Sequence, residues 1–283
     1  MTENYLKTSG TCTMAAMRKD REPKDNKDNK DNKSVVEKTS VLNWNKKFTY
    51  PKSQRSMILG KRHYDISSTQ TKLPSVTTIL SATQSEEKRQ ALANWKLRVG
   101  EKQADFIRDS AAVRGTAMHA YLEDYVLGKQ RVDLTDVGKL AGTMARKIIE
   151  SGLGDLGEVW GSEVTLYYPD RYAGATDLVG LYGDQESICD FKQSNKPKRR
   201  EWIGEMFLQL AAYASAHNKV YNTKITQGVI LMCTPDNFFQ RFIVDGQEFI
   251  DCQEAFHKKV DQYYRDQEDK PQDSETEDEQ KPK

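Results

Sequence analysis

The hydrophobic and polar positions change their period along the chain, and each change predicts a new element. In the first half, apolar residues recur three or four positions apart, which indicates amphipathic helices. Beyond Gly152, Gly154 and Gly157, short runs of β-branched and aromatic residues indicate strands. The predicted helices span residues 73–80, 86–99, 101–127, 138–152, 198–217 and 247–265, and the predicted strands span residues 159–168, 171–182, 187–192, 226–233 and 239–244.

Two of these helices carry a further expectation. The helix over 86–99 places Leu92, Trp95 and Val99 on one stripe, which is expected to be buried. The next helix is predicted to break near Asp109. Both are expected to act as scaffold.

Composition divides the chain into three parts. Residues 1–40 are expected to form a disordered leader, because 24–33 repeats KDN three times without an apolar residue. Residues 41–265 carry the periodic pattern and are predicted to be the folded domain.

Within this domain, residues 41–66 mix aromatic with basic residues and are expected to form one or two short strands. Such a mixture suits either a packed hairpin or a binding surface for single-stranded nucleic acid. Residues 266–283 are predicted to be an acidic disordered tail.

Charge and cysteine content narrow the function classes. The 283 residues carry a net charge of +1. The acidic tail holds eight acidic and three basic residues, so its charge of −5 leaves +6 on the rest, which is compatible with a polyanionic partner. A protein partner for the tail is a second alternative. The four cysteines form no CxxC pair, which disfavours a disulfide framework and a cysteine-ligated metal site.

The sequence also bears on location. No apolar run reaches the ~18 residues of a spanning helix, and the first residues lack the apolar segment of a secretory signal. Acidic residues at Glu3, Asp20 and Glu22 disfavour a mitochondrial transit peptide. We therefore expect no membrane association and a cytoplasmic location, which would be the host cytoplasm if a phage encodes the chain.

The stretch from Gly174 to Lys192 holds the most informative polar residues. Its short β-forming runs flank a turn at Gly183 and predict a β-hairpin. Because side chains alternate along a strand, Asp190 and Lys192 share one face. Asp177, thirteen residues before Asp190, can meet them across the end of the hairpin.

Two carboxylates beside an ammonium group suit the hydrolysis of a phosphodiester. That reaction needs oxygen ligands for a divalent metal and a cation near the reacting oxygens. Asp177 and Asp190 would supply the ligands, and Lys192 the cation. From the residues alone, the three could equally form a surface ion pair worth ~0 to 1 kcal/mol.

The helix over 101–127 carries a second group of unusual residues. Gly115 lies inside the helix, where glycine costs about 1 kcal/mol relative to alanine, so another segment is expected to approach the backbone there. His119 follows one turn later, and Glu123 lies four residues after it on the same face. A histidine on a helix is often structural, so its role depends on the rest of the site.

Taken together, these pieces resemble a RecB-type member of the PD-(D/E)XK nuclease superfamily. Within the superfamily, the segment LPSVTTIL from Leu73 to Leu80, the Trp95-Lys96 pair and the motif spacing are similar to the mitochondrial genome maintenance exonucleases and their phage relatives. The resemblance covers roughly residues 70 to 250. It rests on four motifs in the family's order: Gly115-Thr116-x-x-His119, Gly174-x-x-Asp177, Asp190-x-Lys192 and Gln209-x-x-x-Tyr213.

The resemblance implies an α/β (α+β) fold with a restriction-endonuclease-like core, a mixed central β-sheet flanked by helices. By position, His119, Asp177, Asp190 and the backbone carbonyl of Phe191 match the metal ligands, and Lys192 matches the catalytic lysine. Such ligands suit Mg²⁺ or Mn²⁺. Asp190 stands where many members have glutamate, and the pattern accepts both. The pair Gln209 and Tyr213 matches the motif that supports the site or contacts DNA.

Several charged residues remain open. Glu123 is either a group supporting His119 or a solvent-facing acid, and Glu163 is either a further ligand or, as favoured here, an ion-pair partner. A basic cluster after the catalytic strand, expected at a helix N-terminus, is a candidate for DNA phosphate contacts or a solvated loop. It consists of Lys196, Lys198, Arg199 and Arg200. His217 and His257 match no motif and are expected at the surface.

The leading hypothesis is a metal-dependent DNA exonuclease that acts on single-stranded DNA or on free ends, as the resembled family does. An endonuclease on duplex or branched DNA is the alternative among enzymes. A catalytically inactive DNA-binding module of the same fold is a further alternative, although the intact set of His119, Asp177, Asp190 and Lys192 disfavours it.

Overall fold

The computed structural model describes residues 42–269. The expected leader, residues 1–40, and the expected tail beyond residue 269 lie outside the described residues, so their predicted disorder stays a prediction. The start of the tail is a correction, because residues 266–268 belong to a helix that ends at Glu268. Within residues 42–269, no helix is long and apolar enough to cross a membrane.

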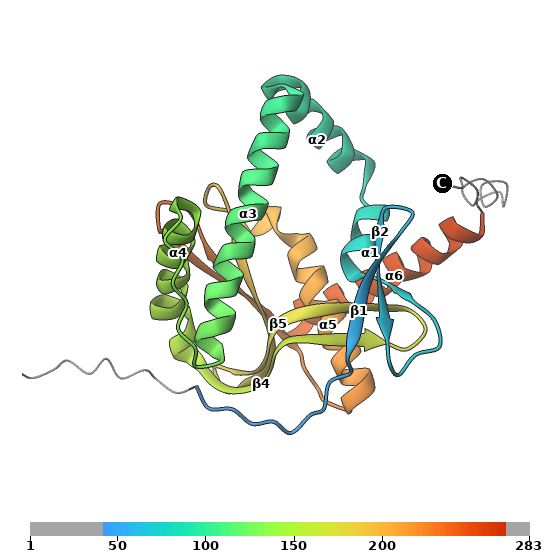
Figure 1. The fold of residues 1–283 in the computed structure, drawn as a ribbon. Coiled ribbons are helices and arrows are strands. Elements are labelled where there is room, and N and C mark those ends of the chain that lie inside the picture. Colours follow the sequence, from blue (N-terminus) through green and yellow to red (C-terminus); the bar gives the residue numbers. More distant parts are fainter. Residues whose placement is uncertain (1–41, 270–283) are drawn as a thin grey trace, which may run out of the picture. The chain divides into compact units, whose positions relative to one another are not determined.

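The centre of the described chain is a mixed five-stranded sheet (Figure 1). Its strands lie in chain order and are antiparallel, except that β6 and β7 run parallel. The parallel pair requires a crossover, which a helix provides. The strands are β4 (Leu156–Tyr168), β5 (Tyr172–Tyr182), β6 (Gln185–Gln193), β7 (Gln227–Cys233) and β8 (Phe239–Asp245).

Helices cover both faces of this sheet. The helices α3 (Glu101–Val126) and α4 (Asp136–Gly152) pack on one face, while α1 (Val76–Ala82), α5 (Gly204–Tyr221) and α6 (Gly246–Glu268) pack on the other. Strand β7 contacts both layers, because Val229 and Leu231 join the core under α3 and α4 while Ile230 joins the core under α5. This alternation explains its continuous apolar run. The fold confirms the predicted mixed sheet flanked by helices.

A second, smaller sheet stands beside the main one. It contains β1 (Ser53–Ile58), β2 (Lys61–Ile66) and the short β3 (Leu73–Pro74), all antiparallel. Residue Ser75, which follows β3, forms a parallel bridge with Ala173 at the start of β5. Tyr64, Ile66, Leu73 and Ala173 form a small buried cluster at this junction. The expected short strands are therefore confirmed, and they are fixed against the central sheet.

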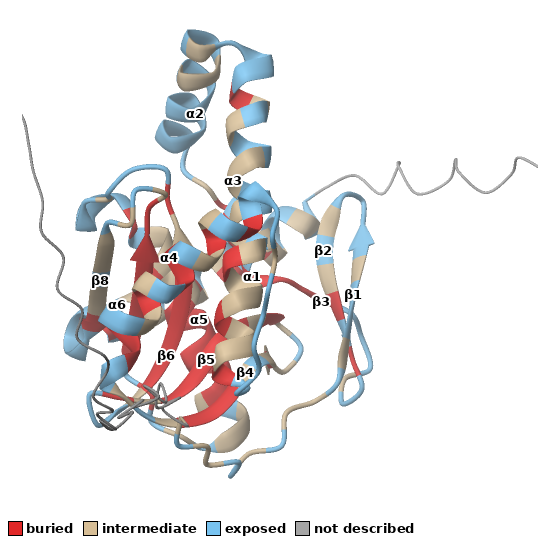
Figure 2. Ribbon diagram, turned by 60° about the vertical axis from the view of Figure 1, so that its left-hand side comes forward, coloured by how far each residue is buried: buried red, intermediate tan, exposed pale blue. Residues whose placement is uncertain are grey.

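The predicted buried stripe of the second helix is wrong. Helix α2 spans Glu86–Val99 as expected, but none of its residues is buried, and Leu92 is 49% exposed. Figure 2 shows α2 with only exposed and partly buried residues, projecting from the core together with the start of α3. Trp95 and Val99 of the stripe are only partly buried. The predicted break near Asp109 is also wrong, because α3 is continuous from residue 101 to 126.

The basic cluster does not lie at the N-terminus of α5. The helix begins at Gly204, after a 3₁₀ turn over Arg200–Trp202. The Lys198 N–H donates to Gln240 Oε1 at 2.7 Å, and Gln240 Nε2 donates to the Lys198 carbonyl at 2.8 Å. These two bonds tie the segment to β8 and hold it out of the helix.

The expectation that His217 lies at the surface is wrong. Its side chain is fully buried on α5, within a group of aromatic rings that includes Phe48 and Tyr221. Thr223 Oγ1 lies 2.7 Å from His217 Nδ1, and the Tyr50 hydroxyl lies 3.2 Å from Nε2. Since the Thr223 hydroxyl donates to Asn218, it accepts from His217 Nδ1–H, and in the neutral ring Nε2 accepts from the Tyr50 hydroxyl.

We expect His217 to make the protein less stable in acid. Burial, helped by the charge of Lys47, lowers the pKa of His217 from 6.5 to about 4. Between these values the unfolded chain binds the proton and the folded chain does not, so stability falls as pH decreases. The loss is about 3 kcal/mol between pH 7 and pH 4.

Urea unfolding at several pH values, with EDTA present, measures this effect. The difference in slope between the wild type and His217→Gln isolates the contribution of His217 from that of the carboxylates. An unchanged slope in His217→Gln would contradict the assignment.

Candidate active site

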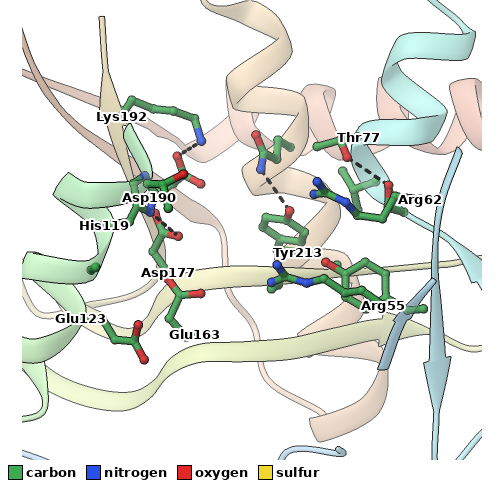
Figure 3. A pocket seen from close by; sticks show the side chains of 18 residues that line it. Arg55, Arg62, Thr77, His119, Glu123, Glu163, Asp177, Asp190, Lys192 and Tyr213 are labelled. Atoms are coloured by element: carbon green, nitrogen blue, oxygen red, sulfur yellow. Dashed lines mark hydrogen bonds and ion pairs between the residues drawn. The ribbon is translucent and has the colours of Figure 1, made fainter. Parts of the chain in front are cut away.

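An open cavity of about 390 Å³ lies where α3, the strands β4 to β6, α5 and the β1–β2 hairpin converge (Figure 3). It gathers residues that lie far apart in the sequence. His119, Glu123, Glu163, Asp177, Asp190, Lys192, Gln209 and Tyr213 all line it. Every motif of the sequence resemblance therefore contributes to one cavity.

The hairpin of β5 and β6 positions Asp177. The strands pair from Leu178 and Cys189 towards the turn, so Asp177 lies just beyond the last paired residue. There, Asp177 Oδ2 accepts from the Phe191 N–H at 2.6 Å, in place of a ladder bond. Burial favours the neutral acid, but His119, Lys192 and this N–H outweigh it and hold the Asp177 pKa below its usual value. Asp177 is thus a carboxylate at neutral pH.

Asp190 and Lys192 lie together on β6, as the alternation of the strand predicts. Their side chains form an ion pair, and the carboxylate is almost fully buried. Burial, opposed by Lys192, raises the Asp190 pKa. Burial acts to lower the Lys192 pKa, but the charges of Asp190 and Asp177 have the larger effect and raise this pKa above its ordinary value. Lys192 is therefore a fixed cation at neutral pH.

Helix α3 brings His119 to these carboxylates. Met118 and Leu122 are buried against the sheet, which leaves His119 on the side facing the cavity. Its Nδ1 lies 3.3 Å from Asp177 Oδ1. Burial favours the neutral ring, but Asp177 outweighs it and raises the His119 pKa to about 9. The predicted meeting of His119 with the hairpin acids is confirmed in its geometry.

Gly115 is the point at which α3 and β6 approach each other. A Cβ atom at this position would lie 3.3 Å from Gln193 Cγ, at the end of β6. The preceding Arg114 donates from Nε to Gln193 Oε1 at 3.0 Å and also bonds Asn195. The approach expected from a mid-helix glycine is therefore present, and it fixes His119 relative to Lys192.

Glu163 lies on β4, beside Asp177 on the neighbouring strand β5. The favoured prediction that it is an ion-pair partner is wrong. Ser162 pairs with Leu178 and Val164 with Thr176, which leaves Glu163 in a left-handed backbone conformation with φ of 52°. The side chain forms no ion pair with a described residue. Burial and the charge of Asp177 raise its pKa to about 7.

The ligand atoms of His119, Glu163 and Asp177 all lie within 4.8 Å of one another. One imidazole with two carboxylates is a donor set that fits a divalent cation such as Mg²⁺ or Mn²⁺. Burial is the main cause of the raised pKa of Glu163, and the charges of Asp177 and Glu123, which a cation would offset, add to it. Asp190 is not part of this group of three, because its carboxylate is turned to Lys192.

Glu123 lines the cavity one turn after His119. Its charge contributes to the raised pKa of Glu163, and Figure 3 shows the two carboxylates next to each other. Of its two predicted roles, the solvent-facing acid is disfavoured by this position. Sequence spacing alone places Glu123 on the face of His119 but does not show Glu163 beside it.

Gln209 and Tyr213 form one unit on α5. Gln209 Nε2 lies 3.0 Å from the Tyr213 hydroxyl, and the tyrosine is 3% exposed. The ring packs directly on Gly174, where a Cβ atom would lie 2.5 Å from Tyr213 Cε1. The absence of a side chain at Gly174 in one motif therefore leaves room for the ring of Tyr213 in another.

This contact predicts a defect in Gly174→Ala. The added methyl group would force the buried Tyr213 ring to move, at a cost of about 1 to 3 kcal/mol in unfolding free energy. Because Gly174 and Asp177 lie on the same strand, cleavage activity should fall with stability. Chemical denaturation measures the first effect. Gly204→Ala is the matched control, since a Cβ atom there meets nothing within 4 Å and the residue begins a helix. Equal stability of the two variants would contradict the packing account.

The basic cluster after β6 does not line the cavity. Arg200 pairs with Glu248 at 2.6 Å and donates to the Ile243 carbonyl at 2.8 Å. Its guanidinium is therefore used within the protein. Lys196, Lys198 and Arg199 stay predictions as DNA contacts.

The structure adds two basic residues that sequence reasoning missed. Arg55 and Arg62 of the β1–β2 hairpin line the cavity on the side opposite the acids, next to Thr77 (Figure 3). The mixture of basic and aromatic residues over 41–66 was the available signal. Nothing in that segment alone indicates that it faces the motifs.

Comparison with known proteins finds sequences similar to this chain. The Mitochondrial genome maintenance exonuclease 1 of Xenopus tropicalis is 31% identical over 180 residues, which cover 58% of this chain and 49% of that protein. The protein of the same name from Mus musculus is 27% identical over 194 residues, covering 62% and 56%. The chain thus spans about half the length of the curated relatives it matches. No family model matches it.

A solved structure is similar in part. It is the crystal structure of a candidate exonuclease from Eubacterium rectale, 13% identical, with a TM-score of 0.40 over 55% of this chain and 65% of that one. The assignment rests on the sequence relatives and on the described sheet. They agree with the resemblance: the chain is similar in sequence to the mitochondrial genome maintenance exonucleases, and its described core is a mixed α/β fold.

Proposed function

We propose that this protein is a metal-dependent DNA exonuclease. One observation carries the proposal: the acids and the imidazole of His119, Glu163 and Asp177 converge in the cavity that also holds the Asp190–Lys192 pair. The names of the sequence relatives support the same reaction class. Mg²⁺ or Mn²⁺ is the proposed cofactor.

His119, Asp177 and Glu163 would hold the cation, with Asp190 and the Phe191 carbonyl as the ligands implied by the family resemblance. A divalent cation at such a site supplies Lewis acidity and lowers the pKa of a bound water. Only neutral imidazole is a ligand, so binding would be coupled to release of the His119 proton. Glu123 would act by supporting Glu163.

Lys192 is proposed to stabilise negative charge on the phosphate during hydrolysis. Its raised pKa means that the ammonium form dominates at neutral pH, so Lys192 cannot accept the proton of the attacking water. A cation fixed beside the reacting oxygens lowers the barrier electrostatically. Asp190 positions this cation through the ion pair.

Gln209 and Tyr213 are proposed to hold the cavity wall in shape. The tyrosine is buried and its hydroxyl is bonded to Gln209, so its contribution is to position β5 through Gly174. A direct contact between Gln209 and DNA is compatible with its place in the cavity lining.

Single-stranded DNA and free ends are the proposed substrates. The names of the sequence relatives support action at DNA ends, and the preference for a single strand is carried over from the family resemblance. Endonuclease action on duplex or branched DNA is the competing activity. An inactive DNA-binding module is disfavoured, because the described site contains every motif residue. A cytoplasmic location and a protein partner for the acidic tail stay predictions.

End-labelled linear DNA and the same sequence closed into a circle test the proposal. With Mg²⁺ or Mn²⁺, the linear single strand should be degraded to short products and the circle should stay intact. EDTA should stop the reaction. Cutting of the circle would indicate an endonuclease, and no cutting of any substrate with either metal would contradict the proposed reaction.

A further inference from the structure

The face of the β1–β2 hairpin that points into the cavity carries two arginines. In the register of this pair, Arg55 lies opposite Tyr64, and Arg62 lies opposite Met57. Cross-strand partners share a face, and so do residues two apart, so Arg55 and Arg62 project from the same side. Both line the cavity wall that faces the acids (Figure 3).

The hairpin holds these side chains in place through its backbone and one buried ring. The Arg62 carbonyl accepts from the Ser75 N–H and from the Thr78 hydroxyl, each at 3.0 Å. Beneath Arg55, Tyr64 is 3% exposed and packs in the cluster that joins the hairpin to β5. The Arg55 guanidinium lies 5.8 Å from the centre of the Tyr64 ring. The strand carrying both contacts is thus anchored to the strand that carries Asp177.

The two guanidinium groups have no acidic partner at ion-pair distance among residues 42–269. Other arginines in this part of the chain, such as Arg171 and Arg200, do have such partners. Arg55 and Arg62 therefore offer a pair of cations across a polar cavity from a cluster of carboxylates. Glu163 interacts electrostatically with Arg55 from beyond ion-pair distance, so the two guanidinium groups are available to an anion from outside the protein.

We propose that Arg55 and Arg62 form a subsite for a phosphate group of the DNA strand, next to the phosphodiester that is cut. This inference rests on the proposed function of the cavity. Guanidinium groups bind phosphate oxygens in a bidentate manner, which gives position as well as affinity. The arginines hold the neighbouring phosphate across the cavity from His119, Asp177 and Lys192. The position of this phosphate then determines which phosphodiester linkage reaches the acids.

The phosphate could be an internal diester or a terminal monoester, and both have the same recognition chemistry. In either case the arginines act on substrate binding more than on the chemical step. Loss of both should raise KM by at least about 10-fold, with a smaller change in kcat. It should also reduce the dependence of binding on salt, because fewer phosphate contacts remain.

A substrate with one uncharged linkage tests the subsite. In a set of linear single strands, a methylphosphonate replaces one phosphate at a time, starting from the end. In the wild type, neutralising the phosphate beside the cut should raise KM by about 10-fold. In the Arg55→Ala/Arg62→Ala double variant, the same substrate should cause no further increase. Strands ending in a phosphate or a hydroxyl distinguish a terminal phosphate from an internal one.

Controls separate the subsite from general effects. Arg146→Ala removes an exposed arginine from α4, outside the cavity, and should keep the wild-type KM and methylphosphonate profile. Arg55→Lys/Arg62→Lys restores the charges without the bidentate geometry and should recover part of the affinity. If the wild type cleaves DNA but the double alanine variant keeps the wild-type KM and methylphosphonate profile, the subsite is wrong. If the wild type cuts no substrate, the proposed function itself fails.

Discussion

Lys192→Ala is expected to reduce DNA cleavage by about 1000-fold or more. Among residues 42–269, the substitution removes the only ammonium group that lines the cavity, so negative charge on the phosphate loses its fixed counter-charge. Removing one preorganised electrostatic contact typically costs about 100- to 1000-fold in kcat. Here the loss should be larger, because the Asp190 carboxylate also loses its partner. Single-turnover cleavage of end-labelled single-stranded DNA with Mg²⁺ measures the effect.

Asp190→Ala should give a loss of the same order, because Asp190 and Lys192 act as one pair. DNA binding, measured by fluorescence anisotropy, should stay within a modest factor in both variants. Lys139→Ala removes an exposed lysine of α4 that does not line the cavity and should cleave like the wild type. Undiminished cleavage by the Lys192 or Asp190 variant would overturn the catalytic assignment.

Glu163→Gln is expected to lower cleavage by about 100-fold and to weaken Mn²⁺ binding. A carboxamide keeps the size of the side chain but removes the charge that a hard cation requires. If Glu163 were an ion-pair partner at the surface, the same change would cost ~0 to 1 kcal/mol of stability and leave metal affinity intact. Calorimetric titration with Mn²⁺ distinguishes the two roles.

Glu123→Gln is the matched control for this measurement. It removes a carboxylate from the same cavity wall, but one outside the group of three ligand atoms. Metal affinity should fall less than in Glu163→Gln. Equal effects in both variants, or none in Glu163→Gln, would remove Glu163 from the proposed ligand set.

The sequence was sufficient for the elements and for the hairpin that carries the acids. Alternation along one strand placed Asp190 and Lys192 on a common face, and the structure confirms it. The mid-helix Gly115 correctly indicated a close approach, here by Gln193. These features depend on the periods of the strand and the helix, which place residues on a face according to their spacing in the sequence.

The role of Glu163 could not be obtained in the same way. Its position depends on a left-handed backbone inside β4 and on the register of β4 against β5. Neither is encoded in a local pattern, because a glutamate in a strand ordinarily reads as a solvent-facing residue. The place of Arg55 and Arg62 was hidden for a similar reason, since the bridge between Ser75 and Ala173 that docks their hairpin joins distant segments.

Other errors came from periodicity without knowledge of a packing partner. The stripe of α2 has helical spacing, but its contacts with neighbouring elements bury none of its residues. The start of α5 was placed too early because Lys198 is held by Gln240, forty-two residues away. His217 matched no motif, and only the fold reveals the aromatic rings that bury it.

The central claim is that a divalent cation binds among His119, Glu163 and Asp177, beside the Asp190–Lys192 pair. Anomalous diffraction from crystals of the protein soaked in Mn²⁺ tests it most directly. The account predicts a peak at coordination distance, about 2 to 2.5 Å, from the side chains of these three residues. A saturated crystal with no peak in this cavity, or with its peak away from His119 and Asp177, would contradict the account.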